Sequence, residues 1–131
     1  MGETFYLSNM CPQDPYFNRR YWSKVEKYVR DLTRSYSIVH VFTGPLYLPN
    51  TQLDGSKWVS YRVIGKNDVA VPTHLFKVLL LENVQGQLYY QGYVLPNKFI
   101  EATTKLESFS TTIEKIEQSA GIIFKKQSLM L

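Results

Sequence analysis

Residues 18–36 carry the clearest helical pattern in the chain. Apolar side chains recur there at steps of three or four, and at about 100° per residue such a spacing lines one face of a helix. These residues are Tyr21, Val25, Tyr28, Val29, Leu32 and Tyr36. The remaining positions are mostly charged: Arg19, Arg20, Lys24, Lys27, Asp31 and Arg34. The pattern predicts an amphipathic helix over 18–36, and the prolines at 12 and 15 predict a turn before it.

Elsewhere the apolar period is close to two, which is typical of strands. Strands are predicted at 5–7, 38–43, 58–64, 76–81 and 88–95. Gly44 and Pro45 are expected to close the strand at 38–43. Residues 50–57 are expected to form a loop with a turn at Asp54 and Gly55. The segment 65–68 is expected to stop the strand at 58–64.

The last two strands, joined through Gln85 and Gly86, predict an antiparallel hairpin. A short helix should follow, because Thr111 and Glu114 have the spacing of a capping box and Gly121 is a typical helix stop. The order is one strand, a long helix, four strands and a terminal helix. This order predicts an α+β fold with a mostly antiparallel sheet.

Composition narrows the class of protein. With 131 residues, 44% of them hydrophobic and 20% charged, the chain can bury a core as one domain. The longest apolar run, residues 78–81, is far too short for a membrane span. The single cysteine, Cys11, excludes an intrachain disulfide and a multi-cysteine zinc site. The formal charge of +4 permits a polyanionic partner without establishing one.

Two sets of residues are candidates for chemistry. Cys11 could pair with a histidine as a nucleophile, or could be an ordinary small buried thiol. Along the long helix, Asn18, Trp22, Glu26 and Arg30 recur every fourth residue, so successive members are neighbours. An amide oxygen near a carboxylate suits Mg²⁺, and an arginine suits phosphate. The alternative is a helix cap at Asn18 and a Glu26–Arg30 surface pair.

The chain resembles the DNA/RNA non-specific endonucleases, a family of ββα-metal nucleases, and within it the endonuclease G branch. The resemblance rests on Thr-Phe-Tyr-Leu-Ser-Asn-Met-Cys-Pro-Gln at 4–13, followed by Asn18 and Trp22. It continues through the segments 32–36, 43–46, 54–55, 61–65, 69–74, 93–97 and 114–124. It implies a hydrolase that cuts DNA and RNA with Mg²⁺ or Mn²⁺, a mitochondrial location, and a homodimer. No membrane span is expected.

The resemblance also assigns roles to single residues. Asn18 resembles the metal-ligand asparagine, and Glu26 the glutamate that holds the water shell of the metal. Arg30 resembles an arginine at the scissile phosphate, where it would bind nucleic acid. Asn9 resembles an asparagine that orients the active site.

The general base of the family is a histidine in an Asp-Arg-Gly-His motif upstream of the segment at 4–13. Neither His40 nor His74 stands in such a motif. The chain also enters strand-like sequence close to Met1, whereas domains usually begin with exposed residues. Residues 1–131 are therefore expected to form the C-terminal part of the nuclease domain, inactive or weak alone. The alternatives are a non-catalytic pseudo-nuclease that binds nucleic acid or a nuclease subunit, and a generic α+β domain.

Overall fold

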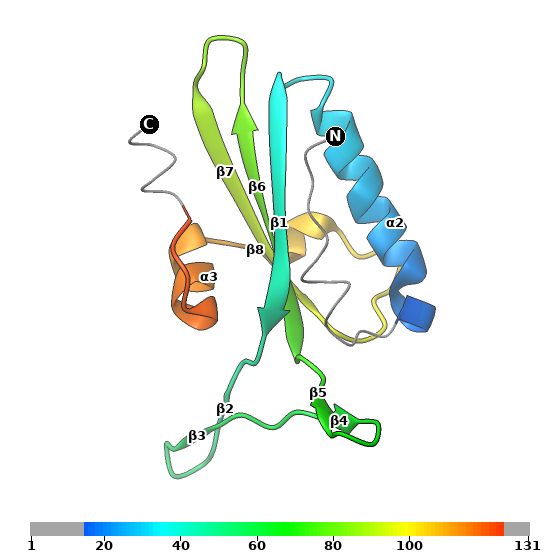
Figure 1. Ribbon diagram of the computed structural model, residues 1–131, viewed down its shortest axis with the longest axis vertical. Helices are drawn as coiled ribbons and strands as arrows, with labels where there is room; N and C mark the ends of the chain where they lie inside the picture. Colours follow the sequence, from blue (N-terminus) through cyan, green and yellow to red (C-terminus); the bar gives the residue numbers. More distant parts are fainter. Residues whose placement is uncertain (1–14, 125–131) are drawn as a thin grey trace.

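The computed structural model describes residues 15–124, with side chains from residue 19 onward. Its middle layer is a four-stranded antiparallel sheet in the order β1-β6-β7-β8. These strands are β1 (Ile38–Leu46), β6 (His74–Glu82), β7 (Leu88–Pro96) and β8 (Ser110–Thr111). Helix α2 (Pro15–Leu32) lies on one face of the sheet and helix α3 (Ile113–Ala120) on the other (Figure 1). The predicted α+β class is confirmed, while the strand predicted at 5–7 falls outside the described residues.

The register of the strands explains why the sheet is covered on both faces. Val39 and Val41 of β1 pair with Leu81 and Leu79 of β6, and these side chains belong to the core under α2. Because successive side chains alternate between faces, Val78 of β6 points toward α3 instead. Strand β6 is consequently buried along almost its whole length.

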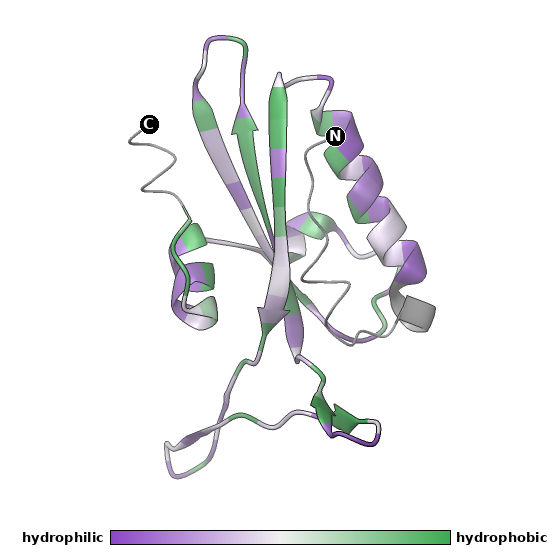
Figure 2. Ribbon diagram, viewed as in Figure 1, coloured by the Kyte–Doolittle hydropathy of each residue, from purple (hydrophilic) through white to green (hydrophobic). Residues whose placement is uncertain are grey.

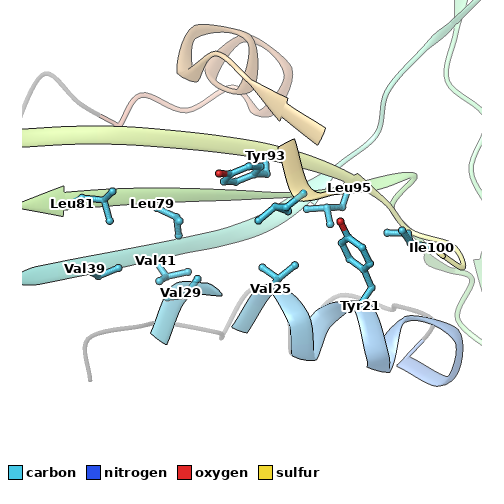
Figure 3. Packing of buried hydrophobic residues seen from close by; sticks show 11 residues of the cluster. Tyr21, Val25, Val29, Val39, Val41, Leu79, Leu81, Tyr93, Leu95 and Ile100 are labelled. Atoms are coloured by element: carbon cyan, nitrogen blue, oxygen red, sulfur yellow. The ribbon is translucent and has the colours of Figure 1, made fainter. Parts of the chain in front are cut away.

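The larger core joins α2 to the sheet. Figure 3 shows Tyr21, Val25 and Val29 of α2 directed toward the side chains of the strands. Their spacing of four residues is the sequence pattern that predicted the helix. The smaller core centres on Ile116 of α3, which is fully buried against Phe76 and Val78.

The predicted bounds of the long helix are wrong at both ends. Helix α2 begins at Pro15, because the first position of a helix needs no donated N–H and tolerates proline. It ends at Leu32, and the next amides turn back three residues, as in the bond from the Thr33 amide to the Arg30 carbonyl (3.1 Å). The Thr33 hydroxyl also donates to that carbonyl, a competition that disfavours further helix. Tyr36 still packs against the core from outside the helix.

Gly44 and Pro45 do not close the first core strand, as the sequence had suggested. Strand β1 continues through both residues to Leu46, and Pro45 pairs with Leu75 of β6. Within the described sheet β1 is an outer strand. An outer strand tolerates proline because one of its edges needs no ladder hydrogen bond.

The strand predicted at 58–64 is also wrong. The region forms two separate ribbons, β2 (Asn50–Thr51) with β3 (Lys57–Trp58), and β4 (Val63–Ile64) with β5 (Val69–Ala70). The alternating pattern is present, but the segment extends away from the sheet and most of its side chains are exposed. Figure 2 shows the ribbon β4–β5 as an apolar patch outside the core. The turn predicted at Asp54 and Gly55 is confirmed.

The C-terminal half follows the predictions more closely. Strands β6 and β7 form the expected antiparallel hairpin. A 3₁₀ turn, η1 (Leu106–Phe109), precedes β8. Helix α3 starts one residue later than predicted, because Thr111 pairs with Gly92 in the sheet and Thr112 caps the helix instead. Gly121 ends α3 in a left-handed conformation, as predicted. Between residues 15 and 124, no helix has the length and apolar character needed to cross a bilayer.

Candidate functional site

The packing of α2 decides which of its side chains face solvent. Its buried stripe at Tyr21, Val25 and Val29 fixes the rotation of the helix on the sheet. Glu26 and Arg30 each follow a stripe residue by one position, about 100° around the axis, and both are exposed. Among residues 15–124 neither side chain forms an ion pair. The predicted surface pair between them is therefore absent, and both groups are free to meet a ligand.

The structure describes only some of the predicted site residues. Position 18 lies in the first turn of α2, two turns before Glu26, which corresponds to about 12 Å along the helix axis. The side chain of Asn18, and all of Asn9 and Cys11, fall outside the described part of the chain. The structure thus brings Glu26 and Arg30 onto one flank of α2, and leaves the contacts of the two asparagines as predictions.

Beside this flank lies a buried lysine that the sequence pattern did not reveal. Lys77 of β6 is only 3% exposed. Its Nζ donates to the Thr43 Oγ1 at 3.1 Å and lies 5.5 Å from the centre of the Trp22 ring. The sequence feature that could have indicated its burial is the position of this lysine inside the apolar strand predicted at 76–81. A strand covered on both faces has no exposed side for such a residue.

Hydrogen bonds hold α2 in place at both of its halves. The Tyr21 hydroxyl donates to the Thr104 carbonyl at 3.0 Å, and the Lys24 ammonium donates to the same carbonyl at 2.7 Å. Farther along, the Tyr28 hydroxyl donates to the Gln91 Oε1 at 2.8 Å. A helix anchored in this way presents its outer side chains in a fixed orientation, which a binding site requires.

Tyr93 completes the second anchor. Its hydroxyl also donates to the Gln91 Oε1, at 3.0 Å. Burial raises the pKa of Tyr93 far above its ordinary value, and the neighbouring Tyr28 raises it further. This hydroxyl therefore stays protonated at any physiological pH and acts as a donor.

The exposed side of α2 is strongly basic. It carries Arg19, Arg20, Lys24, Lys27, Arg30 and, just past the helix end, Arg34. Glu26 and Asp31 are the acidic residues in the same stretch. A cationic face of this kind attracts a polyanion regardless of its sequence.

Neither histidine lies at this flank. His40 is exposed and alternates with Val39 and Val41, so it lies on the sheet face opposite α2. His74 begins β6, where its Nδ1 lies 2.9 Å from the Thr73 Oγ1. Burial lowers the pKa of His74, and the positive charge of Lys98 lowers it further. Both histidines therefore lie away from the Glu26–Arg30 flank.

Replacing Lys98 with glutamine is expected to raise the pKa of His74, because protonation would no longer be opposed by a nearby cation. An NMR titration of the imidazole resonances measures the shift, and Lys115→Gln on α3 serves as the control. The folded state binds the His74 proton less readily than the unfolded state. Stability should therefore fall as the pH drops through the ordinary value of 6.5. An unchanged His74 pKa in Lys98→Gln contradicts the placement of these groups.

The donor set around α2 can be compared with the needs of a metal ion. Within the described residues no three His, Cys, Asp or Glu side chains gather in a way that would hold a metal. This excludes a dense all-protein cage in that part of the chain. Mg²⁺ does not need one, because it keeps several waters and takes few protein ligands. The described donor set therefore leaves room for a hydrated ion beside the exposed Glu26.

Comparisons with known proteins identify the family of the chain. A family described as DNA/RNA non-specific endonuclease matches residues 1–129. Human mitochondrial endonuclease G is 53% identical over 124 residues, which is 95% of this chain and 42% of that protein. Nuclease C1 of Cunninghamella echinulata var. echinulata is 44% identical over 125 residues, 95% of this chain and 49% of that protein.

The fold has a solved counterpart as well. A crystal structure of the EndoG/EndoGI complex, which concerns EndoG inhibition, matches with a TM-score of 0.83 at 49% identity. The match covers 92% of this chain and 49% of the other. The chain spans less than half the length of the human and fungal relatives. Since the family match extends over nearly all of its residues, the chain belongs to the DNA/RNA non-specific endonuclease family.

Proposed function

We propose that this chain forms part of a metal-dependent, sugar-non-specific endonuclease that hydrolyses phosphodiester bonds in DNA and RNA. The proposal rests on the two charged side chains that one flank of α2 exposes in a chain of this family. There Glu26 and Arg30 stand in solvent, next to each other and without an ion-pair partner in the described residues. A carboxylate and a guanidinium so placed suit a hydrated cation and a phosphate.

Asn18 is the proposed direct metal ligand, and Glu26 acts through the metal's waters. The rise of about 12 Å between their positions on the helix supports this division, since two direct bonds to one Mg²⁺ are each only about 2.1 Å long. The metal is proposed to be Mg²⁺, with Mn²⁺ as a substitute. When bound, it would stabilise the charge that develops on the phosphate and the leaving oxygen.

Arg30 is proposed to donate to the oxygens of the scissile phosphate, and Asn9 to orient the site. The cationic side chains along α2 would hold the flanking backbone. Contacts to phosphate carry no information about base sequence, so cleavage with little sequence preference is expected for both DNA and RNA.

The general base is proposed to lie outside these 131 residues. His40 lies on the sheet face opposite α2, and His74 begins β6, where its Nδ1 contacts Thr73. A base must come within hydrogen-bond reach of the water that it activates. We infer that the chain corresponds to the C-terminal part of the nuclease domain and that alone it is inactive or weak.

A missing base predicts chemical rescue. Imidazole added to the 131-residue chain should accelerate nicking of supercoiled plasmid in the presence of Mg²⁺, because a small base can enter the place of the absent histidine. General base catalysis contributes about 10²–10⁴-fold, and free imidazole should restore part of it. EDTA should abolish the rescued activity. Nicking that is independent of both Mg²⁺ and imidazole contradicts the proposal.

The second candidate is a non-catalytic pseudo-nuclease. It is favoured by the absence of a histidine from the α2 flank and by the basic surface of the helix. Such a protein would bind DNA and RNA, or a catalytic nuclease subunit, without cutting at any imidazole concentration. The rescue assay therefore separates the two candidates.

The location is proposed from the names of relatives, and the assembly from the family resemblance. Relatives from human, cattle and Caenorhabditis elegans are named mitochondrial endonuclease G. We propose the same location for this chain, and a homodimer as its assembly. Fractionation of cells expressing the tagged protein, and light scattering of the purified protein, test the two proposals.

A further inference from the structure

An open cavity of about 300 Å³ lies where β6 begins and β7 ends, outside the flank of α2 described above. Three separate segments line it: 60–62, 71–73 and 97–98. Two of the lining residues, Arg62 and Lys98, are cations, and no lining residue is a carboxylate. The size suits a phosphate with its sugar, since ligand pockets begin at about 300 Å³.

Hydrogen bonds between the three segments preform this cavity. The Asn97 amide donates to the Thr73 carbonyl at 3.0 Å, and the Asn97 side chain donates to the Pro72 carbonyl at 3.0 Å. The Val71 amide donates to the Arg62 carbonyl at 2.7 Å. The backbone that carries both cations is therefore tied to the start of β6.

The two cations are available to a ligand. Arg62 and Lys98 are both exposed, and neither forms an ion pair with another described residue. Burial lowers the pKa of His74, the residue after the lining residue Thr73, and the charge of Lys98 lowers it further. A planar guanidinium and an ammonium without a competing carboxylate make a suitable setting for a phosphate group.

The start of β6, where the lining segments meet, lies at the same end of the ribbon as the first turns of α2 (Figure 1). Beyond Lys98 the chain runs to Ala102, whose carbonyl accepts a hydrogen bond from Lys24 of α2 at 3.2 Å. Four residues of extended chain span at most about 14 Å. Lys98 therefore lies no farther than this from Ala102, which Lys24 joins to α2, and a strand of a few nucleotides can cover such a distance.

We propose that Arg62 and Lys98 form a second phosphate subsite, which holds the backbone of the nucleic-acid strand a few nucleotides from the cleavage site. This inference rests on the proposed function. The subsite would add a phosphate contact that neither α2 nor the metal provides. The length of strand that the protein contacts would then extend beyond the cleavage site.

The test is the salt dependence of binding to a fluorescent single-stranded oligonucleotide in EDTA, measured by anisotropy. Each phosphate contact contributes about 0.7 to the slope of log affinity against log salt for a single strand. The variant Arg62→Gln/Lys98→Gln should lower that slope by about this amount and weaken binding several-fold at low salt. Lys115→Gln on α3, an exposed cation that does not line the cavity, is the control.

The outcomes separate the two proposals. If the unmodified chain binds the strand and the double variant keeps its full slope, the subsite is overturned while the proposed function stands. If the unmodified chain does not bind DNA or RNA at all, both are overturned. Thermal unfolding of the double variant confirms that a changed slope does not reflect loss of the fold.

A titration with inorganic phosphate distinguishes a strand from a free anion. Amide resonances of 60–62 and 97–98 should respond to the oligonucleotide at far lower concentration than to phosphate at constant ionic strength. Equal responses to the two ligands would overturn the assignment to a nucleic-acid strand.

Discussion

Asn18→Ala is expected to reduce Mg²⁺-dependent nicking, measured with imidazole present, by about 10³-fold or more. A bound metal supplies several kcal/mol of transition-state stabilisation, and each 1.36 kcal/mol corresponds to about tenfold in rate. The amide at position 18 is the proposed direct ligand, so its loss should remove most of that term. Plasmid nicking across a range of Mg²⁺ concentrations measures the effect. Persistent nicking in Asn18→Ala would rule out the assigned metal site.

A pair of carboxylates on the same helix provides the matched comparison. Glu26→Gln should cost about 10–100-fold, because groups that act through the metal's outer shell typically contribute that much. Asp31→Asn removes an equal charge from another exposed position of α2 and should change little. Equal effects of the two changes would mean that charge, and not placement, explains the role of Glu26.

Leu79→Ala is expected to lower the free energy of unfolding by about 2–5 kcal/mol, the range found when a buried leucine is truncated and leaves a cavity. Leu79 lies in the inner strand β6, is 1% exposed, and packs in the core under α2. Since small domains are stable by only about 5–15 kcal/mol, the loss would be severe. Urea denaturation followed by circular dichroism measures it.

The same substitution at Leu53 is the control. Leu53 is fully exposed in the β2–β3 ribbon, so Leu53→Ala should change stability by no more than about 0.5 kcal/mol. If the two variants were equally stable, the core assigned to α2 and the sheet would be wrong.

Local patterns predicted the elements that bury one face. The stripe of Tyr21, Val25 and Val29 gave the helix and its orientation, because helical period and burial coincide there. The β6–β7 hairpin was predictable because two apolar runs flank the turn at Gln85 and Gly86. The strand at 58–64 was not, because alternation shows only that a segment can form a strand. Whether such a segment pairs with a sheet depends on the rest of the chain.

Part of the candidate site could be predicted from the sequence. Glu26 and Arg30 were predicted from their spacing and the family resemblance, and the structure leaves both exposed on one flank of α2. Lys77 was missed, since a lysine in a strand is ordinarily expected on the solvent side. Its burial follows from helix α2 and helix α3 covering opposite faces of the sheet, which no local pattern specifies.

The sequence by itself determined the family, the α+β class, the rotation of α2 and the stop of α3 at Gly121. These depend on periodicity, motif and backbone preference, all of which are properties of neighbouring residues. Only the tertiary structure decided that β1 runs through Pro45, that His40 faces away from α2, and that Arg62 meets Lys98 at one cavity. Each of these depends on which distant segments pair and pack, because long-range contacts fix strand edges, sheet faces and shared pockets.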